Sequence, residues 1–324
     1  MTTRRTALQG IAAGALTVAG APVFGQDNSP TTVLVGAASL MDFTARLIAE
    51  QLRESLNRPA VVVSKLGAGQ RVALGEAKRA APDGRTLVFA TSGPFTIYPQ
   101  VYNKLDYDPV GDFTPIVGIG SFDVAIAAGP QSGATTLKEM MEWQRKRPAG
   151  SAVFGSAPGN GSLSHFLGIN VSMATDVPMT HVAYKDSGVG IVDLAAGRLP
   201  MLITGLSPLV EMHKAGKIRI LAVSGDKRSP LVPEVPTARE AGVNVSTSTT
   251  TAVFGPAGMS PEQVRRLHDA IAPMLDKPDV REKLAGQGMT PWKAGPQEVA
   301  ASHAAERKHF EQLAKASGFV RQDA

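Results

Sequence analysis

Short apolar runs alternate with amphipathic segments along the first third of the chain. Residues 31–35, 60–64 and 86–90 are rich in β-branched and apolar side chains, and each run predicts a strand. Apolar positions at helical spacing predict helices over 43–56 and from 70 to about 81. Strands that alternate with helices predict a parallel sheet with helices on both of its faces.

The same alternation returns in the second half of the chain. We expect strands at 151–154, 179–184, 200–204 and 218–223, and helices at 162–173, 188–197, 207–215 and 236–241. A helix over 136–147 precedes this second α/β unit, and its start carries the capping pair Thr136 and Glu139.

Two strand-like segments, 121–128 and 247–254, bracket the second unit, and a shorter strand is expected at 115–117. The simplest topology lets the chain cross to a second lobe at the first segment and return at the other. Three C-terminal helices, at 261–275, 278–286 and 296–316, then pack on the first lobe. We therefore predict lobe one from residues 27–122 and 252–324, and lobe two from residues 123–251.

The segment 151–168 joins a strand, a loop of small residues and the start of a helix. Ser162 is a good helix N-cap, and Gly161 lets a ligand approach the backbone before it. Free N–H groups and the positive end of the helix dipole favour an anion such as a carboxylate at this place. The alternative is a plain strand-to-helix turn that binds nothing.

A comparable junction lies at residues 36–42, where Ser39 and Asp42 form a capping pattern ahead of a helix. Ligands of parallel sheets bind outside the carboxyl ends of the strands, so this loop and 91–95 are expected at one edge. Neither principal junction contains Lys or Arg. A bound carboxylate is therefore expected to be held by N–H groups, hydroxyls and helix ends.

Composition narrows the class of protein. The 324 residues include 43% hydrophobic and 19% charged side chains, which is ordinary for a globular protein of one or two domains. The absence of cysteine excludes disulfides, Cys-ligated metal centres and a Cys nucleophile. The net charge is +5, but the charges are dispersed and no nucleic-acid-binding motif is present.

Residues 1–26 have the pattern of an export signal. Arg4 and Arg5 precede an apolar run from Ile11 to Ala21 that is too short for a membrane anchor, and small residues lead to a cleavage site near Gly25. The arginine pair also resembles a twin-arginine signal, so either Sec or twin-arginine export is open. We expect a periplasmic mature chain that is not embedded in the membrane.

Motifs for catalysis, metal binding and nucleotide binding are missing. No G-x-S-x-G, H-E-x-x-H or phosphate-binding loop is present, and the six histidines lack metal-ligand spacing. His303 and His309 are expected to be solvated on a surface helix. His165 and Asp42 have two open roles each: a ligand contact, or a packing or capping function.

The chain resembles the Bug family of extracytoplasmic solute receptors, which serve tripartite tricarboxylate transporters. The resemblance covers about residues 30 to 318. The segments that carry it, in this order and spacing, are APDG (81–84), LDYDP (105–109), HVAYK (181–185), AGKIR (215–219), PEVPT (233–237) and FGPAG (254–258). The first loop departs from the family pattern P-F-x-x-G-G-x-x-D, because residues 34–42 read LVGAASLMD.

The resemblance implies a two-lobe periplasmic binding protein fold of type 2, with two crossing strands and a ligand cleft between the lobes. It also implies a small organic acid as ligand, membrane permease subunits as partners, and no cofactor. The ligand-binding residues carried over by position are Ala37, Ala38, Ser39, Asp42, Thr91, Ser92, Ser156, Asn160, Gly161, Ser162, His165, Tyr184 and Thr204.

The prediction is an exported solute-binding protein without enzymatic activity. The main alternative is a periplasmic sensor subunit that reports ligand occupancy to a signalling kinase. A more distant alternative is a hydrolase or isomerase that uses Asp42 or His165.

Overall fold

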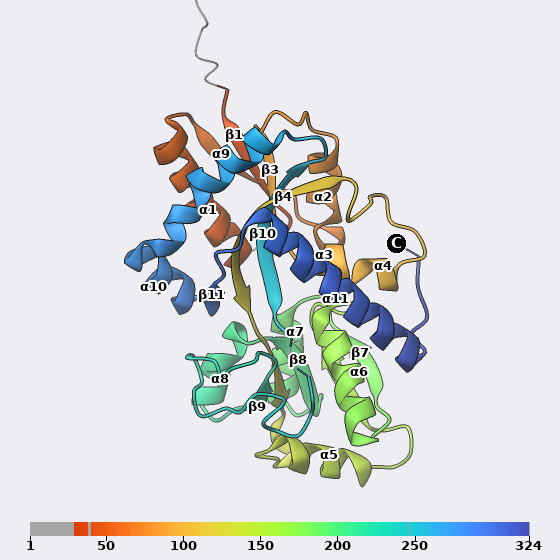
Figure 1. Cartoon of the computed structure of the whole chain (residues 1–324). Helices are drawn as coiled ribbons and strands as arrows, with labels where there is room; N and C mark the ends of the chain where they lie inside the picture. Colours follow the sequence, from red (N-terminus) through yellow and green to blue (C-terminus); the bar gives the residue numbers. More distant parts are fainter. Residues whose placement is uncertain (1–28, 38–39, 246, 324) are drawn as a thin grey trace, which may run out of the picture.

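The structure is a computed structural model and describes residues 29–37, 40–245 and 247–323. The chain folds into two α/β lobes (Figure 1). The first lobe has a six-stranded sheet of order β11-β4-β10-β3-β1-β2. Its strands are β1 (Thr31–Val35), β2 (Ala60–Ser64), β3 (Thr86–Thr91), β4 (Phe113–Phe122), β10 (Thr249–Pro256) and β11 (Met289–Pro291).

Helices cover both faces of this sheet. They are α1 (Leu40–Leu56), α2 (Arg71–Lys78), α3 (Gly93–Thr96), α4 (Tyr98–Val101), α9 (Pro261–Ile271), α10 (Pro278–Gly286) and α11 (Pro296–Ser317). Side chains of β1 alternate between two cores: Val33 and Val35 pack on the α1 side, and Leu34 packs on the α2 side. Burial on both faces explains why the strand is apolar at every core position.

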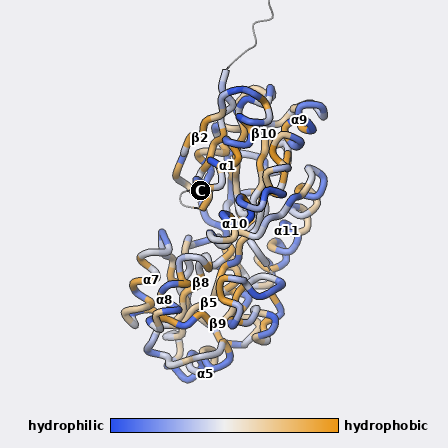
Figure 2. Tube along the Cα trace, turned by 90° about the vertical axis from the view of Figure 1, so that its left-hand side faces the viewer, coloured by the Kyte–Doolittle hydropathy of each residue, from blue (hydrophilic) through white to orange (hydrophobic). Residues whose placement is uncertain are grey.

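The second lobe has a five-stranded sheet of order β7-β6-β8-β5-β9. Its strands are β5 (Val124–Ala128), β6 (Val153–Ser156), β7 (Thr180–Ala183), β8 (Met201–Gly205) and β9 (Arg219–Val223), and its helices are α5 (Leu137–Arg145), α6 (Leu163–Thr175), α7 (Ser187–Ala195) and α8 (Val210–Lys214). Apolar strands lie inside this lobe as in the first (Figure 2). The predicted capping box of Thr136 and Glu139 starts α5.

Both sheets are mixed, which corrects the expectation of purely parallel sheets. In the first, β1 pairs in parallel with β2 and β3, but β10 runs antiparallel to β3 and β4. In the second, β6 pairs in parallel with β7 and β8, but β5 runs antiparallel to β8 and β9. The antiparallel members follow from the two crossings, because a chain that leaves one lobe and returns must reverse its direction.

The prediction of one continuous strand over 121–128 is wrong, because the chain breaks pairing at Asp123 and changes sheets there. The carbonyl oxygen of Asp123 accepts a hydrogen bond from the N–H of Leu206, and its carboxylate accepts one from the hydroxyl of Ser248 at 2.6 Å. Ser248 lies just before β10. The two crossings are therefore tied to each other by a partly buried hydrogen bond.

Helix α11 joins the lobes on one side (Figure 1). Its Phe310 packs against Phe166 of α6, with ring centroids 5.6 Å apart, and Phe319 packs against the same ring at 5.3 Å. Ile97 and Val101 of the first lobe belong to the same apolar cluster. The two lobes thus share a continuous core beside the cleft.

Three further predictions differ from the structure. The predicted helix at 236–241 is a turn: Thr237 and Glu240 exchange side-chain bonds to each other's N–H groups, and Gly242 then takes a φ of +89° that ends the turn. The expectation of a solvated His303 is wrong, because the ring is buried and stacks on Phe95 at 5.4 Å. Helices α3 and α4 and strand β11 are not among the predicted elements.

Candidate ligand-binding cleft

A cavity of about 290 Å³ lies between the two lobes. First-lobe residues on its lining include Ala37, Gln70, Thr91, Ser92, Tyr98 and Glu306. Second-lobe residues include Ala157, Gly161, Ser162, Leu163, Ser164 and Ser187. The carboxyl ends of β3, β6 and β8 reach this cavity, as the topology of parallel strands predicts.

The start of α6 forms the second-lobe wall. The hydroxyl of Ser162 caps the helix by accepting a hydrogen bond from the N–H of His165 at 3.1 Å. Gly161 has a φ of +71°, and its N–H donates to Nδ1 of His165 at 3.1 Å. The N–H groups of Leu163 and Ser164, in the first turn, have no acceptor within the helix. Both residues line the cavity, and a helix start of this kind can bind an anion.

Hydroxyl groups hold the loop before α6. The carbonyl oxygen of Ala157 accepts from Ser164 at 3.3 Å and from Thr204 at 2.9 Å. The hydroxyl of Thr204 also lies 2.6 Å from the hydroxyl of Ser187, which lines the cavity. This network fixes the loop and satisfies Thr204, which is fully buried behind the wall.

The first-lobe wall is built around the end of β3. The side-chain amide of Gln70 binds Thr91 twice: Nε2 donates to Oγ1 at 2.5 Å, and Oε1 accepts from the backbone N–H at 3.2 Å. The backbone N–H of Ser92 donates to the carbonyl oxygen of Thr250 on β10 at 2.8 Å. These bonds anchor the β3 end to the crossing strand and leave hydroxyl groups along the cavity.

Glu306 of α11 is the single charged side chain among the described residues that line the cavity. Its Oε1 accepts long hydrogen bonds from Thr250 at 3.5 Å and from Ser302 at 3.4 Å. Burial raises the pKa of Glu306, and nearby hydroxyls, led by that of Ser92, act in the opposite direction. The described part of the lining contains no Lys, Arg or His.

The structure brings five of the predicted site residues to the cavity: Ala37, Thr91, Ser92, Gly161 and Ser162. Ala38 and Ser39, and the predicted export signal at 1–26, lie outside the described residues. A ligand role for Ala38 and for the helix end at Ser39 therefore stays a prediction.

Two predicted residues have partners of their own away from the cavity. Asp42 binds Arg46 at 2.8 Å and the hydroxyl of Ser64 at 2.9 Å, and these partners lower its pKa. The hydroxyl of Tyr184 donates to Asp193 at 2.9 Å. A ligand role for either residue remains a prediction without support from the cavity.

Three more of the predicted site residues lie within or behind the loop that precedes α6. Ser156 is fully buried and its hydroxyl lies 2.7 Å from Nε2 of His181. Asn160 is exposed and does not line the cavity. His165 stacks on His181 with ring centroids 3.7 Å apart, and burial lowers the pKa of His165 to about 3 and that of His181 to about 4. A neutral His165 supports the loop through Gly161.

Sequence reasoning missed Gln70, Tyr98, Glu306 and Phe310, all of which line the cavity. Gln70 is the first residue of the helix predicted from position 70, and Tyr98 follows the predicted loop 91–95, so both lie close to segments that the sequence singled out. Glu306 lies in the middle of a long, charge-rich helix. Nothing in its local pattern distinguishes it from the solvated acids of the same helix.

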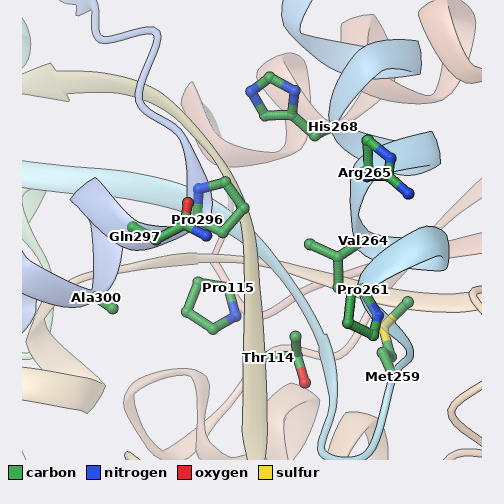
Figure 3. Close-up of a pocket in the computed structure, with 10 residues that line it drawn as sticks. All are labelled: Thr114, Pro115, Met259, Pro261, Val264, Arg265, His268, Pro296, Gln297 and Ala300. Atoms are coloured by element: carbon green, nitrogen blue, oxygen red, sulfur yellow. The ribbon is translucent and has the colours of Figure 1, made fainter.

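A larger hollow of about 570 Å³ lies on the outside of the first lobe, between α9 and α11 (Figure 3). Val264, Arg265 and His268 of α9 face Pro296 and Gln297 of α11 across it. None of the predicted junction residues reaches this hollow. The smaller interlobe cavity is the better candidate because both lobes and their strand ends contribute to it.

The alternatives to a binding protein gain no support from the described residues. No cluster of three potential metal-binding side chains occurs among them. Asp42 and His165 do not meet in the cavity, and each is satisfied by neighbours. Within the described part of the chain, no helix has the length and apolar character needed to cross a bilayer.

Solved structures share this architecture. The R. palustris protein Rpa4515 with adipate is 30% identical, has a TM-score of 0.81, and is matched over 91% of this chain and 99% of that one. MatC from Rhodopseudomonas palustris with bound malate is 28% identical, with a TM-score of 0.75 over 88% of this chain and 98% of that one. The two-lobe binding-protein fold is confirmed.

Sequence comparison agrees. Protein BugT of Bordetella pertussis is 29% identical over 260 residues, which cover 80% of this chain and 79% of BugT. Residues 44–319 match the family described as the tripartite tricarboxylate transporter family receptor. Because that match spans most of the chain, the predicted resemblance is confirmed: the protein belongs to the tripartite tricarboxylate transporter receptor family, a family of solute receptors.

Proposed function

We propose that this protein captures a small organic carboxylate in the interlobe cavity and delivers it, in the periplasm, to the membrane permease subunits of a tripartite transporter. The observation that carries the proposal is the start of α6, where the N–H groups of Leu163 and Ser164 border the cavity. The adipate and malate bound by two relatives support a carboxylate as the ligand class. Residues 1–26 supply the export signal in this proposal.

The binding energy is compatible with a site that lacks a cation. A partly buried helix end contributes up to ~2 kcal/mol to binding an anion. Each hydrogen bond to a charged group adds about 1.5–3 kcal/mol. A few such bonds reach the ~8 kcal/mol that corresponds to micromolar affinity. Seating the carboxylate on N–H groups and hydroxyls therefore requires no salt bridge.

The first test is a thermal-shift and calorimetric screen of mono- and dicarboxylates, aromatic acids included, with the mature protein. A ligand that binds only the folded state adds roughly 2.7 kcal/mol of stability at 100 times its Kd. We expect at least one small acid to raise the melting temperature. If none does so at millimolar concentration, the carboxylate proposal is wrong.

The second test asks whether the α6 end holds the carboxylate. Leu163→Pro removes one N–H donor, and the helix tolerates it because Leu163 is the first helical position and Ser162 already has the extended conformation required before proline. Leu163→Ala is the matched control, since it shortens the side chain but keeps the N–H. We expect the proline variant to bind about tenfold more weakly than the alanine variant. Equal affinities would place the carboxylate elsewhere.

A further inference from the structure

Glu306, the acidic side chain in the cleft, has hydroxyl groups as its neighbours. Glu306 is half-buried at the first-lobe wall, where Oε1 faces the hydroxyls of Thr250 and Ser302 at 3.5 and 3.4 Å. The hydroxyl of Thr96 donates to the carbonyl oxygen of Ser92 at 3.1 Å. An ionised carboxylate offers about four acceptor positions. The hydroxyls of Ser92 and Thr96 also favour the ionised form, but all four of these hydroxyls are neutral and none supplies a counter-charge, which a cationic group of a ligand would supply.

Among the described residues that line the cavity, no cationic side chain pairs with the Glu306 carboxylate. The neighbouring Arg307 directs its guanidinium to the carbonyl oxygen of Phe95 at 3.4 Å. Hydroxyls around Glu306 favour its ionised form, and burial opposes ionisation by raising the pKa. A second ligand carboxylate at this wall would meet a like charge, whereas an ammonium group would form a charge-assisted pair.

We propose that Glu306 makes the cleft selective for small amino acids whose ammonium group lies opposite the carboxylate, in preference to dicarboxylates of the same length. The ligand carboxylate lies at the start of α6, and its ammonium group binds Glu306. The inference rests on the proposed function for the carboxylate end. It adds the chemical identity of the ligand's other end, which binds at the first-lobe wall.

Matched ligands test the selectivity directly. Calorimetry at pH 7.5 compares hexanoate, adipate and 6-aminohexanoate, and then succinate and 4-aminobutanoate for the shorter length. We expect each amino acid to bind at least about tenfold more tightly than the dicarboxylate of equal length. Adipate binding as tightly as 6-aminohexanoate, with succinate and 4-aminobutanoate likewise equal, overturns the inference but leaves the proposed function intact. No binding by any acid overturns both.

A variant pair assigns the effect to Glu306. Glu306→Gln keeps the shape and removes the charge, so the preference for the amino acid should fall about tenfold or more. Glu311→Gln is the control on the same helix, because Glu311 pairs with Lys315 outside the cavity. An unchanged preference in Glu306→Gln refutes the role of this residue. Adipate affinity that rises from pH 7.5 to 5.5 in the parent but not in Glu306→Gln would support the role, because protonation of Glu306 removes its repulsion of the second carboxylate.

Discussion

The two walls of the cleft are built by different means. The second-lobe wall is mainly one local segment, from Ala157 to Ser164, with Ser187 and Gly205 beside it, and its hydroxyls and N–H groups are neutral. The first-lobe wall combines the end of β3 with Glu306, which lies more than 200 residues further along the chain. One wall is suited to hold an anion, and the other carries an acid.

This difference separates two tasks. A strand-to-helix junction supplies donors for a carboxylate whatever else the ligand carries, because the donors are main-chain groups. Discrimination between ligands requires side chains, and on the described lining the charged side chain comes from α11. In the proposed binding mode, the second lobe binds the common part of the ligand and the first lobe binds the distinguishing part.

The largest expected effect comes from Gly161→Val, which tests how closely the walls meet. A β-carbon at Gly161 would lie 2.5 Å from Cγ1 of Val101, on α4 of the first lobe. The sequence alone assigned Gly161 to the close approach of a ligand, whereas the structure shows that a valine there would collide with the opposite lobe. We expect unfolding free energy to fall by at least about 3 kcal/mol, from positive-φ strain and overpacking together.

Gly133→Val is the control for that variant. Gly133 has a φ of +63°, close to that of Gly161, but a β-carbon there meets nothing within 4 Å. Because only backbone strain opposes this variant, its free energy of unfolding should fall by about 1–2 kcal/mol. Equal losses in chemical denaturation of the two variants would show that the lobes do not press together at Gly161.

A smaller effect is expected from Glu306→Gln in the ligand-free protein. Burial raises the folded-state pKa of Glu306, so the folded state is penalised as pH rises from the unfolded value near 4.5 through the raised one. The variant should be more stable than the parent at pH 7, by on the order of 1 kcal/mol. This advantage should shrink as pH falls below 4.5, where both states of the parent are protonated.

Thermal denaturation between about pH 7 and pH 4 measures this difference, again with Glu311→Gln for comparison. Burial raises the pKa at Glu306, whereas Lys315 lowers the pKa of Glu311, so Glu311→Gln should not stabilise the protein at neutral pH. A parent that is more stable than Glu306→Gln at pH 7 would mean that the acid wall is fully satisfied without ligand.

The smallest effect is expected from Ser162→Gly on the neutral wall. Glycine is tolerated at an N-cap, so stability should fall by only a few tenths of a kcal/mol. Ligand affinity should stay within about twofold, because the N–H groups of Leu163 and Ser164 remain. Ser260→Gly, at the capped start of α9 outside the cleft, is the control for the capping cost. A tenfold loss of affinity in Ser162→Gly alone would show that the hydroxyl itself binds the ligand.

Local sequence patterns were sufficient to predict most helices and strands and one of the two walls of the cleft. The apolar runs predicted β1, β2, β3 and β6, and the small-residue loop before Ser162 predicted the helix start that lines the cavity. These features depend on neighbours within a few residues, namely strand burial, a cap and a turn. The same locality explains the failure at 236–241, where a single capped turn has the beginning of a helix but Gly242 ends it.

What the sequence by itself determined is the alternation of strands and helices, the position of the strand-to-helix junction that lines the cavity, and the family resemblance. The tertiary structure alone decided that the chain changes sheets at Asp123, that His303 is buried, and that Glu306 reaches the cavity. Each of these depends on contacts between segments far apart in the chain. An acid on a helix has the same local pattern whether it faces water or a ligand, and only the packing of α11 across both lobes distinguishes the two.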